Sequence, residues 1–248
     1  MTIRSINEAG RALMLWTALQ ADITHRSEDA AERQKAEDHM GLMTPIIKGV
    51  LTDLGFDNAV KAQQMYGGHG YINEWGMGQF VRDARITMIY EGANGIQALD
   101  LVGRKLGRDG GRAVMTFFNE VGAYVKEQGG NAAMTPFVTP LGEALGHLQQ
   151  ATMWFMQNAL QKPDNAGAGA TDYMHLFGLT ALGYMWCRMV EAAQAKLAQG
   201  ANGGAERLNA KLVTARFFME RMLPETAAHL VRIKSGADSV MELPAEAF

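Results

Sequence analysis

Residues 82–105 read RDARITMIYEGANGIQALDLVGRK, and they form the most informative stretch of this chain. A single carboxylate, Glu91, stands between a largely apolar run at 86–90 and a glycine-containing turn at 92–95 that leads into a helical pattern. A catalytic base would benefit from that setting, because burial raises the pKa of a carboxyl group and makes it a better proton acceptor. The alternative is that Glu91 only caps the following helix, where a negative charge is favoured.

Helical patterns extend over most of the chain on both sides of this stretch. Proline is scarce, with six residues, and Ala, Leu and Met dominate between polar positions, which favours helices. We find no strand-like alternation of useful length and no internal repeat, so the sequence predicts an all-α fold: a helical bundle followed by a helical extension. The expected helical segments are 5–19, 36–65, 80–84, 94–107, 112–128, 141–161, 171–199 and 205–222, with a terminal piece after Pro224.

Local sequence patterns predict where the first two helices begin and which face of the first helix is buried. The first helix is expected to begin at Ser5, which has capping-box spacing to Glu8. The charged segment 25–38 is either a connector or the solvated face of a helix, and Pro45 either kinks the second helix or starts a new segment. The expected apolar stripe of the first helix is Ile6, Ala9, Leu13, Trp16 and Leu19.

Glycine-rich segments indicate the loops and linkers. The segment 66–78 holds too many glycines for a helix, and Asn94 is expected to cap the helix that ends near Gly107. The GRDGG segment after it predicts a boundary between a domain at 1–107 and a second one at 108–248. Further linkers are expected at 129–136, 162–170 and 199–205.

Composition narrows the class of protein. Hydrophobic residues make up 48% and charged residues 20% of the 248 positions, as in soluble globular proteins. The net charge of -3 gives no electrostatic footprint for nucleic acid. The single cysteine, Cys187, cannot form an internal disulfide, and its apolar helical setting predicts a buried, inert thiol.

Targeting, membrane and metal signals are not found. The N-terminal segment MTIRSINEAGRALMLW lacks a long apolar core and a small-residue cleavage site, so we predict no signal peptide. The most apolar long stretch, 177–190, is interrupted by Thr180 and Arg188 and is too short for a membrane span. No His-Glu-x-x-His or paired-cysteine pattern occurs, so no metal site is predicted. We therefore expect a cytoplasmic protein without a membrane segment.

The segment QQMYGGHGYINEWGMGQFVRDARITMIYEGANGIQALDLVGRKL, at 63–106, closely resembles the last part of the catalytic domain of acyl-CoA dehydrogenases. Those flavoenzymes carry a Gln-x-x-Gly-Gly-x-Gly-[Phe/Tyr] loop, then Arg-Asp-Ala, then Tyr-Glu-Gly-Thr-x-x-Ile-Gln. The combined order and spacing are highly specific, although each piece alone is weak. The resemblance covers about 3–106. The remaining chain more loosely resembles the helical extension of a larger subgroup, which includes the 3-methylmercaptopropionyl-CoA dehydrogenases.

The resemblance implies that Glu91 is the catalytic base. In the family, the base removes the α-proton of an acyl-CoA thioester while the β-hydrogen leaves as hydride to the flavin. The main-chain N–H of Glu91 would donate to the thioester carbonyl and stabilise the enolate oxygen that develops there. Tyr90 and Gly92 would lie beside the substrate, with glycine allowing a close approach of the backbone.

The resemblance also implies that Gln64, Gly67 and Gly68 contact the adenosine-diphosphate part of FAD. Successive N–H groups of a glycine-rich turn suit a pyrophosphate, whereas the alternative for this loop is a tight helix-ending turn. One position departs from the family, because Ala93 stands where a threonine is usual. The hydroxyl contact to FAD is therefore absent there, and Ala93 is expected only to line the cofactor.

The remaining matched residues have structural interpretations. Arg82, Asp83 and Arg85 match the family's Arg-Asp-Ala-[Arg/Lys] element and are interpreted as bracing the loops through ion pairs. Trp75 and Tyr71 are expected to pack against the glycine-rich loop.

A complete family member also has an N-terminal helical domain and a middle β-domain, and neither is recognisable in this sequence. We therefore expect a truncated piece or one part of a split enzyme. By itself it should be inactive, because a base without a positioned flavin has no hydride acceptor. The resemblance implies FAD as cofactor, acyl-CoA as substrate, electron-transfer flavoprotein as electron acceptor and a homo-oligomer. The alternative function is a non-catalytic helical module for self-association.

Overall fold

The computed structural model describes residues 1–159, 161–200 and 204–247. These residues form helices and turns, with no strand among them, so the predicted all-α fold is confirmed. The α-helices are α1 (Thr2–Arg26), α2 (Ala30–Met65), α3 (Met77–Ile86), α4 (Asn94–Asp100), α5 (Arg112–Gln128), α6 (Thr135–Asn158), α7 (Pro163–Ala198), α8 (Ala205–Arg221), α9 (Glu225–Lys234) and α10 (Asp238–Met241). Shorter helical turns are η1 (Gly67–Gly70), η2 (Asn73–Trp75), η3 (Leu101–Lys105), η4 (Arg108–Gly111) and η5 (Ala245–Ala247).

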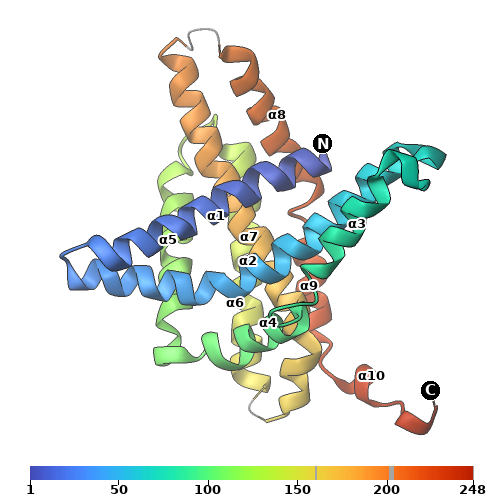
Figure 1. Ribbon diagram of the computed structural model, residues 1–248. Helices are drawn as coiled ribbons and strands as arrows, with labels where there is room; N and C mark the ends of the chain where they lie inside the picture. Colours follow the sequence, from blue (N-terminus) through green and yellow to red (C-terminus); the bar gives the residue numbers. More distant parts are fainter. Residues whose placement is uncertain (160, 201–203, 248) are drawn as a thin grey trace.

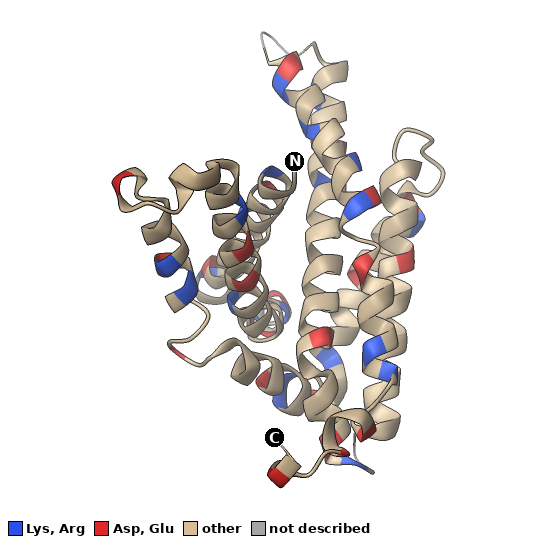
Figure 2. Cartoon of the chain, turned by 90° about the vertical axis from the view of Figure 1, so that its right-hand side faces the viewer, with Lys and Arg blue, Asp and Glu red and all other residues tan. Residues whose placement is uncertain are grey.

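The helices form two layers. The antiparallel hairpin of α1 and α2 lies across the helices α5 to α9 (Figure 1), and the side view shows the same two layers, with Lys and Arg interspersed among Asp and Glu (Figure 2). The hairpin turn is short because Asp29 caps α2, its carboxylate accepting the N–H of Ala31 at 2.8 Å. Most of the charged segment 25–38 is therefore the first part of α2, and this helix continues without interruption past the buried Pro45.

Helix α7 is the centre of the core. Half of its 36 residues are buried, and Tyr173, Phe177 and Trp186 are fully covered. The same continuous core includes Leu13 of α1 and Ile46 of α2, so both predicted domains, 1–107 and 108–248, contribute to it. The apolar stretch 177–190 is this central part of α7. Among the described residues, no helix combines the length and apolar character needed to cross a membrane.

Glycines allow α7 to approach its neighbours closely. A Cβ at Gly178 would lie 2.6 Å from a methyl group of Val50 on α2, and a Cβ at Gly169 would lie 2.9 Å from the Phe155 ring of α6. The predicted linker at 162–170 is therefore wrong, because its proline is at the start of α7 and its last two residues, Gly169 and Ala170, are buried in that helix. Helix packing outweighs the low helix propensity of glycine there.

The start of the first helix also differs from the prediction. Helix α1 already begins at Thr2, and Ser5 is a buried interior residue whose hydroxyl donates to the carbonyl of Thr2. Glu8 pairs with Arg4 and with Lys211 of α8 instead of closing a capping box. Of the expected stripe, Leu19 is 53% exposed and does not reach the core.

Other boundaries agree more closely. Helix α5 has the predicted bounds, because Asp109, Gly110 and Gly111 adopt left-handed backbone conformations that end one helix and begin the next. Helix α6 is an exception, because it begins six residues before the expected position 141. The predicted linker at 199–205 lies partly outside the described residues. Cys187 is fully buried as predicted, and burial raises the pKa of its thiol.

Candidate active-site segment

Glu91 lies in a strained turn between α3 and α4. Its φ of 53° is in the left-handed region, which a residue with a side chain rarely adopts, and Gly92 follows with a φ of 85°. A left-handed non-glycine residue costs on the order of 1–3 kcal/mol and persists only where the surrounding structure imposes it. Such residues cluster at functional sites.

Two contacts hold this turn. The main-chain N–H of Asn94 donates to the carbonyl of Met88 at 3.1 Å, which closes a loop around Glu91 and Gly92. The side-chain amide of Gln97 donates to the carbonyl of Gly92 at 3.3 Å. Glycine suits position 92 because of its positive φ, and a Cβ there would lie 2.7 Å from that amide nitrogen, so Gln97 would have to move aside.

The carboxylate of Glu91 is exposed in this chain. Ile89 and Tyr90, which were expected to cover it, are each 50% exposed. Within the described residues, neither a hydrogen bond nor an ion pair of this carboxylate is found, and no side chain caps α4 at its N-cap residue, Ala93. Any burial of Glu91 must therefore come from protein or ligand outside the described residues.

Asn94 does not cap α4, contrary to the prediction. It is the first residue of that helix, and its side chain turns towards α2 instead. Its amide oxygen accepts from Lys48 Nζ at 2.6 Å, and its amide nitrogen lies 2.6 Å from Asp53 Oδ1 and 3.1 Å from the carbonyl of Gly49. The prediction failed because these α2 residues lie more than forty positions away in the sequence.

The glycine-rich loop folds back onto the end of α2. Gln63, one residue before the Gln64 of the motif, donates from its side-chain amide to the carbonyl of Gly70 at 2.9 Å. Gln64, Gly67 and Gly68 are exposed, and a Cβ at either of these two glycines would meet nothing within 4 Å. The sequence did not indicate a role for Gln63, because the family motif contains Gln64 instead.

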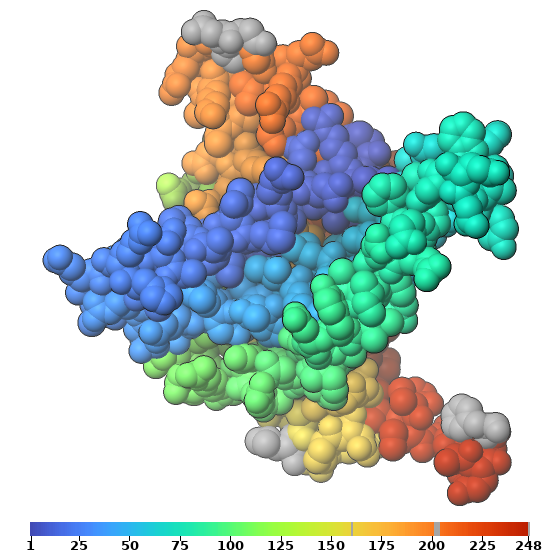
Figure 3. Space-filling view, in the orientation of Figure 1, coloured from blue at the N-terminus to red at the C-terminus, as the bar shows by residue number. Residues whose placement is uncertain are grey.

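The aromatic residues of the loop behave differently from each other. The ring of Trp75 packs edge-on against His69 with 5.1 Å between centroids, as expected. Tyr71 is 86% exposed and does not pack against the loop. The loop lies at one of the projecting ends of the molecule, coloured teal in Figure 3.

The two predicted parts of the site lie at opposite ends of α3. This helix has ten residues and therefore separates the glycine-rich loop from the Glu91 turn by about 15 Å along its axis, at ~1.5 Å per residue. Within this chain the two motifs are thus separated by the length of α3.

Ion-pair bracing of the loops is not observed. Among the described residues, Arg82, Asp83 and Arg85 form no ion pair. Asp83 accepts from Gln79 at 2.7 Å, and the guanidinium of Arg85 lies 5.8 Å from the ring centre of Phe56. These side chains lie on an exposed helix, where water competes with ion pairing.

A cavity of about 210 Å³ lies elsewhere, between α1, α2 and α5. Its lining includes Trp16, Lys35, His39 and Glu120, and it does not include the Glu91 turn. Within the described residues, no group of three or more metal-ligating side chains is present.

The surface around both motifs is strongly apolar. Many of the large apolar side chains from the end of α2 to the end of α4 are at least 43% exposed. A concentration of exposed apolar side chains in one segment is typical of a protein interface. These side chains are Met65, Tyr66, Tyr71, Ile72, Trp75, Phe80, Ile86, Ile89, Tyr90, Ile96 and Leu99.

Comparison with known families agrees with this arrangement. A family model described as "Acetyl-CoA dehydrogenase C-terminal like" matches residues 117–244, which is more than half of the chain. A second model, described as "Acyl-CoA dehydrogenase, C-terminal domain", matches residues 12–106. The chain therefore belongs to the acyl-CoA dehydrogenase family, and the resemblance inferred from the sequence is confirmed.

Individual relatives extend the comparison. The chain is 36% identical to 3-methylmercaptopropionyl-CoA dehydrogenase of Ruegeria pomeroyi, over 97% of its own length and 41% of that protein. It is 29% identical to the broad-specificity linear acyl-CoA dehydrogenase FadE5 of Mycobacterium tuberculosis, over 100% of the chain and 42% of that protein. A butyryl-CoA dehydrogenase of Syntrophomonas wolfei is 26% identical over 99% of the chain and 40% of that protein. The chain thus spans about two fifths of the length of these curated relatives.

Proposed function

We propose that this chain is the base-bearing C-terminal portion of an FAD-dependent acyl-CoA dehydrogenase and that Glu91 removes the α-proton of an acyl-CoA thioester. The observation that carries this proposal is the left-handed backbone of Glu91, which is held by contacts on both sides of the turn. A residue that only capped a helix would need no such strain.

The geometry of the turn supports the roles proposed for its backbone. Among the described residues, the N–H of Glu91 donates to no main-chain carbonyl, so it is free to donate to the carbonyl of a thioester. A donor placed in this way would stabilise negative charge on that oxygen as the α-proton leaves. Gly92 and Tyr90 would line the acyl group beside it.

Open space at the glycine-rich loop supports a contact with FAD. Gly67 and Gly68 are exposed with open space at their Cα atoms, so a phosphate group could approach the main chain there. We propose that Gln64, Gly67 and Gly68 hold part of the cofactor and that Ala93 lines it. When bound, FAD would supply the hydride acceptor of the reaction, and electron-transfer flavoprotein is the proposed partner that then removes the electrons.

A second function is favoured by the exposed apolar surface. That surface is the kind that drives self-association, so a non-catalytic helical module that forms homo-oligomers is the alternative. Purified protein that shows flavin absorbance would favour the first proposal. Colourless oligomers that gain no flavin from added FAD would favour the second.

The catalytic assignment is tested by Glu91→Gln in the flavoenzyme that contains this chain. Glutamine keeps the size of the side chain but cannot accept the proton, so flavin reduction by substrate should fall by roughly 100- to 10,000-fold. FAD and acyl-CoA should still bind, and Glu91→Asp should retain some activity because only its reach is shorter. Stopped-flow bleaching of the oxidised flavin measures this rate, and near-normal bleaching in Glu91→Gln would remove Glu91 from the mechanism.

A further inference from the structure

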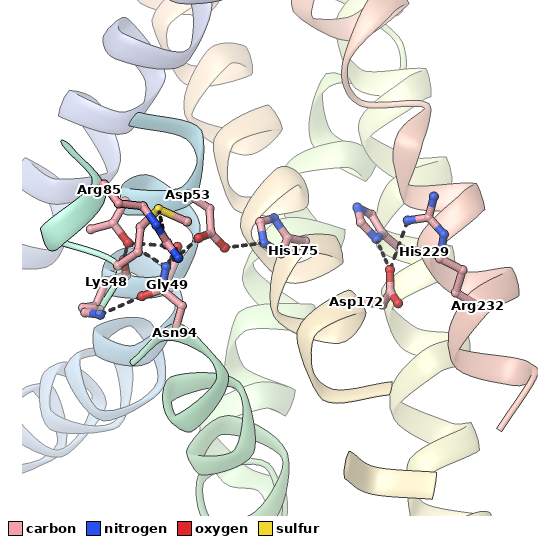
Figure 4. A network of polar contacts seen from close by, with 11 residues as sticks. Lys48, Gly49, Asp53, Arg85, Asn94, Asp172, His175, His229 and Arg232 are labelled. Atoms are coloured by element: carbon pink, nitrogen blue, oxygen red, sulfur yellow. Dashed lines mark hydrogen bonds and ion pairs between the residues drawn. The ribbon is translucent and has the colours of Figure 1, made fainter. Parts of the chain in front are cut away.

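A chain of polar contacts connects the Glu91 turn to the central helix α7. Asn94 is anchored twice, by its main-chain N–H on Met88 and by its side chain on α2. Because Asn94 closes the loop that contains Glu91 and Gly92, any shift of Asn94 moves that loop. Figure 4 shows its side chain pointing into a cluster formed by Lys48, Gly49 and Asp53.

Asp53 connects Asn94 to α7. Its Oδ1 accepts from the side-chain amide of Asn94 at 2.6 Å, and its Oδ2 lies 2.8 Å from Nε2 of His175. The two carboxylate oxygens therefore have different partners, one on α4 and one on α7. With both oxygens engaged, Asp53 has one orientation, and that orientation fixes where Asn94 can lie.

On the side away from Asp53, His175 contacts α9. Its ring stacks on the ring of His229 from α9, with 5.8 Å between centroids and an interplanar angle of 19°. His229 Nδ1 lies 2.6 Å from Asp172, which also accepts from Arg232 at 3.3 Å. Burial opposes the effect, but the hydrogen bonds from His229 and Arg232 lower the pKa of Asp172, so it remains charged.

We propose that Asn94, Asp53 and His175 are positioning residues for Glu91. They form a relay through which the C-terminal part of the chain sets the left-handed turn that presents the base. This inference rests on the proposed function of Glu91, and it assigns a role to α7 and α9 in the reaction. The alternative is that the three side chains only attach α4 to its neighbours, without any effect on the Glu91 turn.

The relay is tested first on the backbone of this chain. A residue with positive φ gives a strong intraresidue cross-peak between its amide and α protons in NMR spectra. Asn94→Ala and His175→Leu should weaken this cross-peak at Glu91, because the turn can relax when its anchor is lost. Asp38→Ala is the matched control, since it removes a carboxylate that joins α2 to Arg112 of α5 and leaves the relay intact. An unchanged cross-peak in both relay variants, with folded protein, would overturn the proposal.

The second test measures flavin reduction in the flavoenzyme that contains this chain. His175→Leu should slow reduction at saturating substrate by up to roughly 100-fold, as expected for a misplaced base, with KM little changed. His175→Gln should recover most of the rate, because its side-chain amide can also donate to Asp53. Asp38→Ala should reduce flavin at the wild-type rate.

The possible failures are distinguishable. A normal rate in His175→Leu together with a slow Glu91→Gln would overturn the relay and leave the catalytic assignment intact, whereas a normal rate in Glu91→Gln would overturn the proposed function itself. A rate for His175→Gln as low as that of His175→Leu would also overturn the relay. If His175→Leu does not fold, Asp53→Ala replaces it: alanine removes the partner of both Asn94 and His175, so flavin reduction should be slow, and a normal rate would overturn the relay.

Discussion

At the scale of single residues, His39 shows how burial changes a titration. It borders the cavity between α1, α2 and α5, its Nε2 is 3.1 Å from Thr17 Oγ1, and its ring packs edge-on against Trp16. Burial lowers the pKa of His39 from 6.5 to about 4, with Glu120 opposing the shift and Lys35 adding to it. The native protein therefore keeps this imidazole neutral where the unfolded chain would protonate it.

Because of His39, the native protein should become less stable on acidification. Between the unfolded pKa of 6.5 and the native value of about 4, only the unfolded chain binds the proton, so the free energy of unfolding falls as the pH decreases through this window. The loss from His39 should reach about 3 kcal/mol at ~1.4 kcal/mol per pKa unit. Above pH 6.5 this loss is absent.

Urea unfolding of wild type and His39→Gln at neutral pH and near pH 4 measures the effect. Glutamine does not titrate in this range, so wild type should lose more stability than His39→Gln on acidification. Equal losses in the two proteins would show that His39 is protonated in the native state. The carboxylates contribute the same background to both proteins.

At the scale of elements, the crossing of α2 and α7 depends on Gly178. Its missing side chain leaves room for Val50, whose branched side chain cannot move aside easily. We predict that Gly178→Ala lowers the free energy of unfolding by about 1–2 kcal/mol, because crowding in a packed core, which costs up to ~3 kcal/mol, exceeds the gain of about 1 kcal/mol in helix propensity.

Gly55 is the matched control for that substitution. It lies within α2, and a Cβ there would meet nothing within 4 Å. Gly55→Ala should therefore raise the free energy of unfolding by up to about 1 kcal/mol. Denaturant unfolding of both variants checks the pair, and stabilisation by Gly178→Ala would mean that α2 and α7 are less tightly packed than described.

At the scale of the whole molecule, the exposed apolar surface between Met65 and Leu99 predicts association. This surface surrounds the proposed site, and covering it would remove large apolar areas from water. We predict that the isolated chain forms dimers or higher oligomers, with a mass that rises with concentration in light scattering. A monomeric mass at high concentration would contradict this prediction.

Surface variants locate the interface. Phe80 on α3 is 64% exposed and Val213 on α8 is 61% exposed, so both can be replaced by serine with little effect on the core. Phe80→Ser should weaken association, because it lies within the apolar surface around the site. Val213→Ser should leave the mass unchanged, and an equal effect of both variants would argue against this interface.

The sequence alone determined the local features of this protein. The order of the helices, the bounds of α5 and the exposed glycine-rich loop depend on periodicity and on left-handed residues that neighbours in the sequence specify. The family was also readable from one segment, because its motifs lie in fixed order within about forty residues. The role of Glu91 stays a prediction at either level.

Only the tertiary structure decided which residues meet across the chain. Asn94 matched a helix cap in the sequence, yet its side chain binds α2, and His175 reaches Asp53 across 122 positions with no local pattern to signal it. The glycines at 162–170 indicated a linker until the contact of Gly169 with Phe155 showed a packed helix. Local patterns reflect the energy of one segment, whereas these features depend on contacts that exist only once distant helices have packed together.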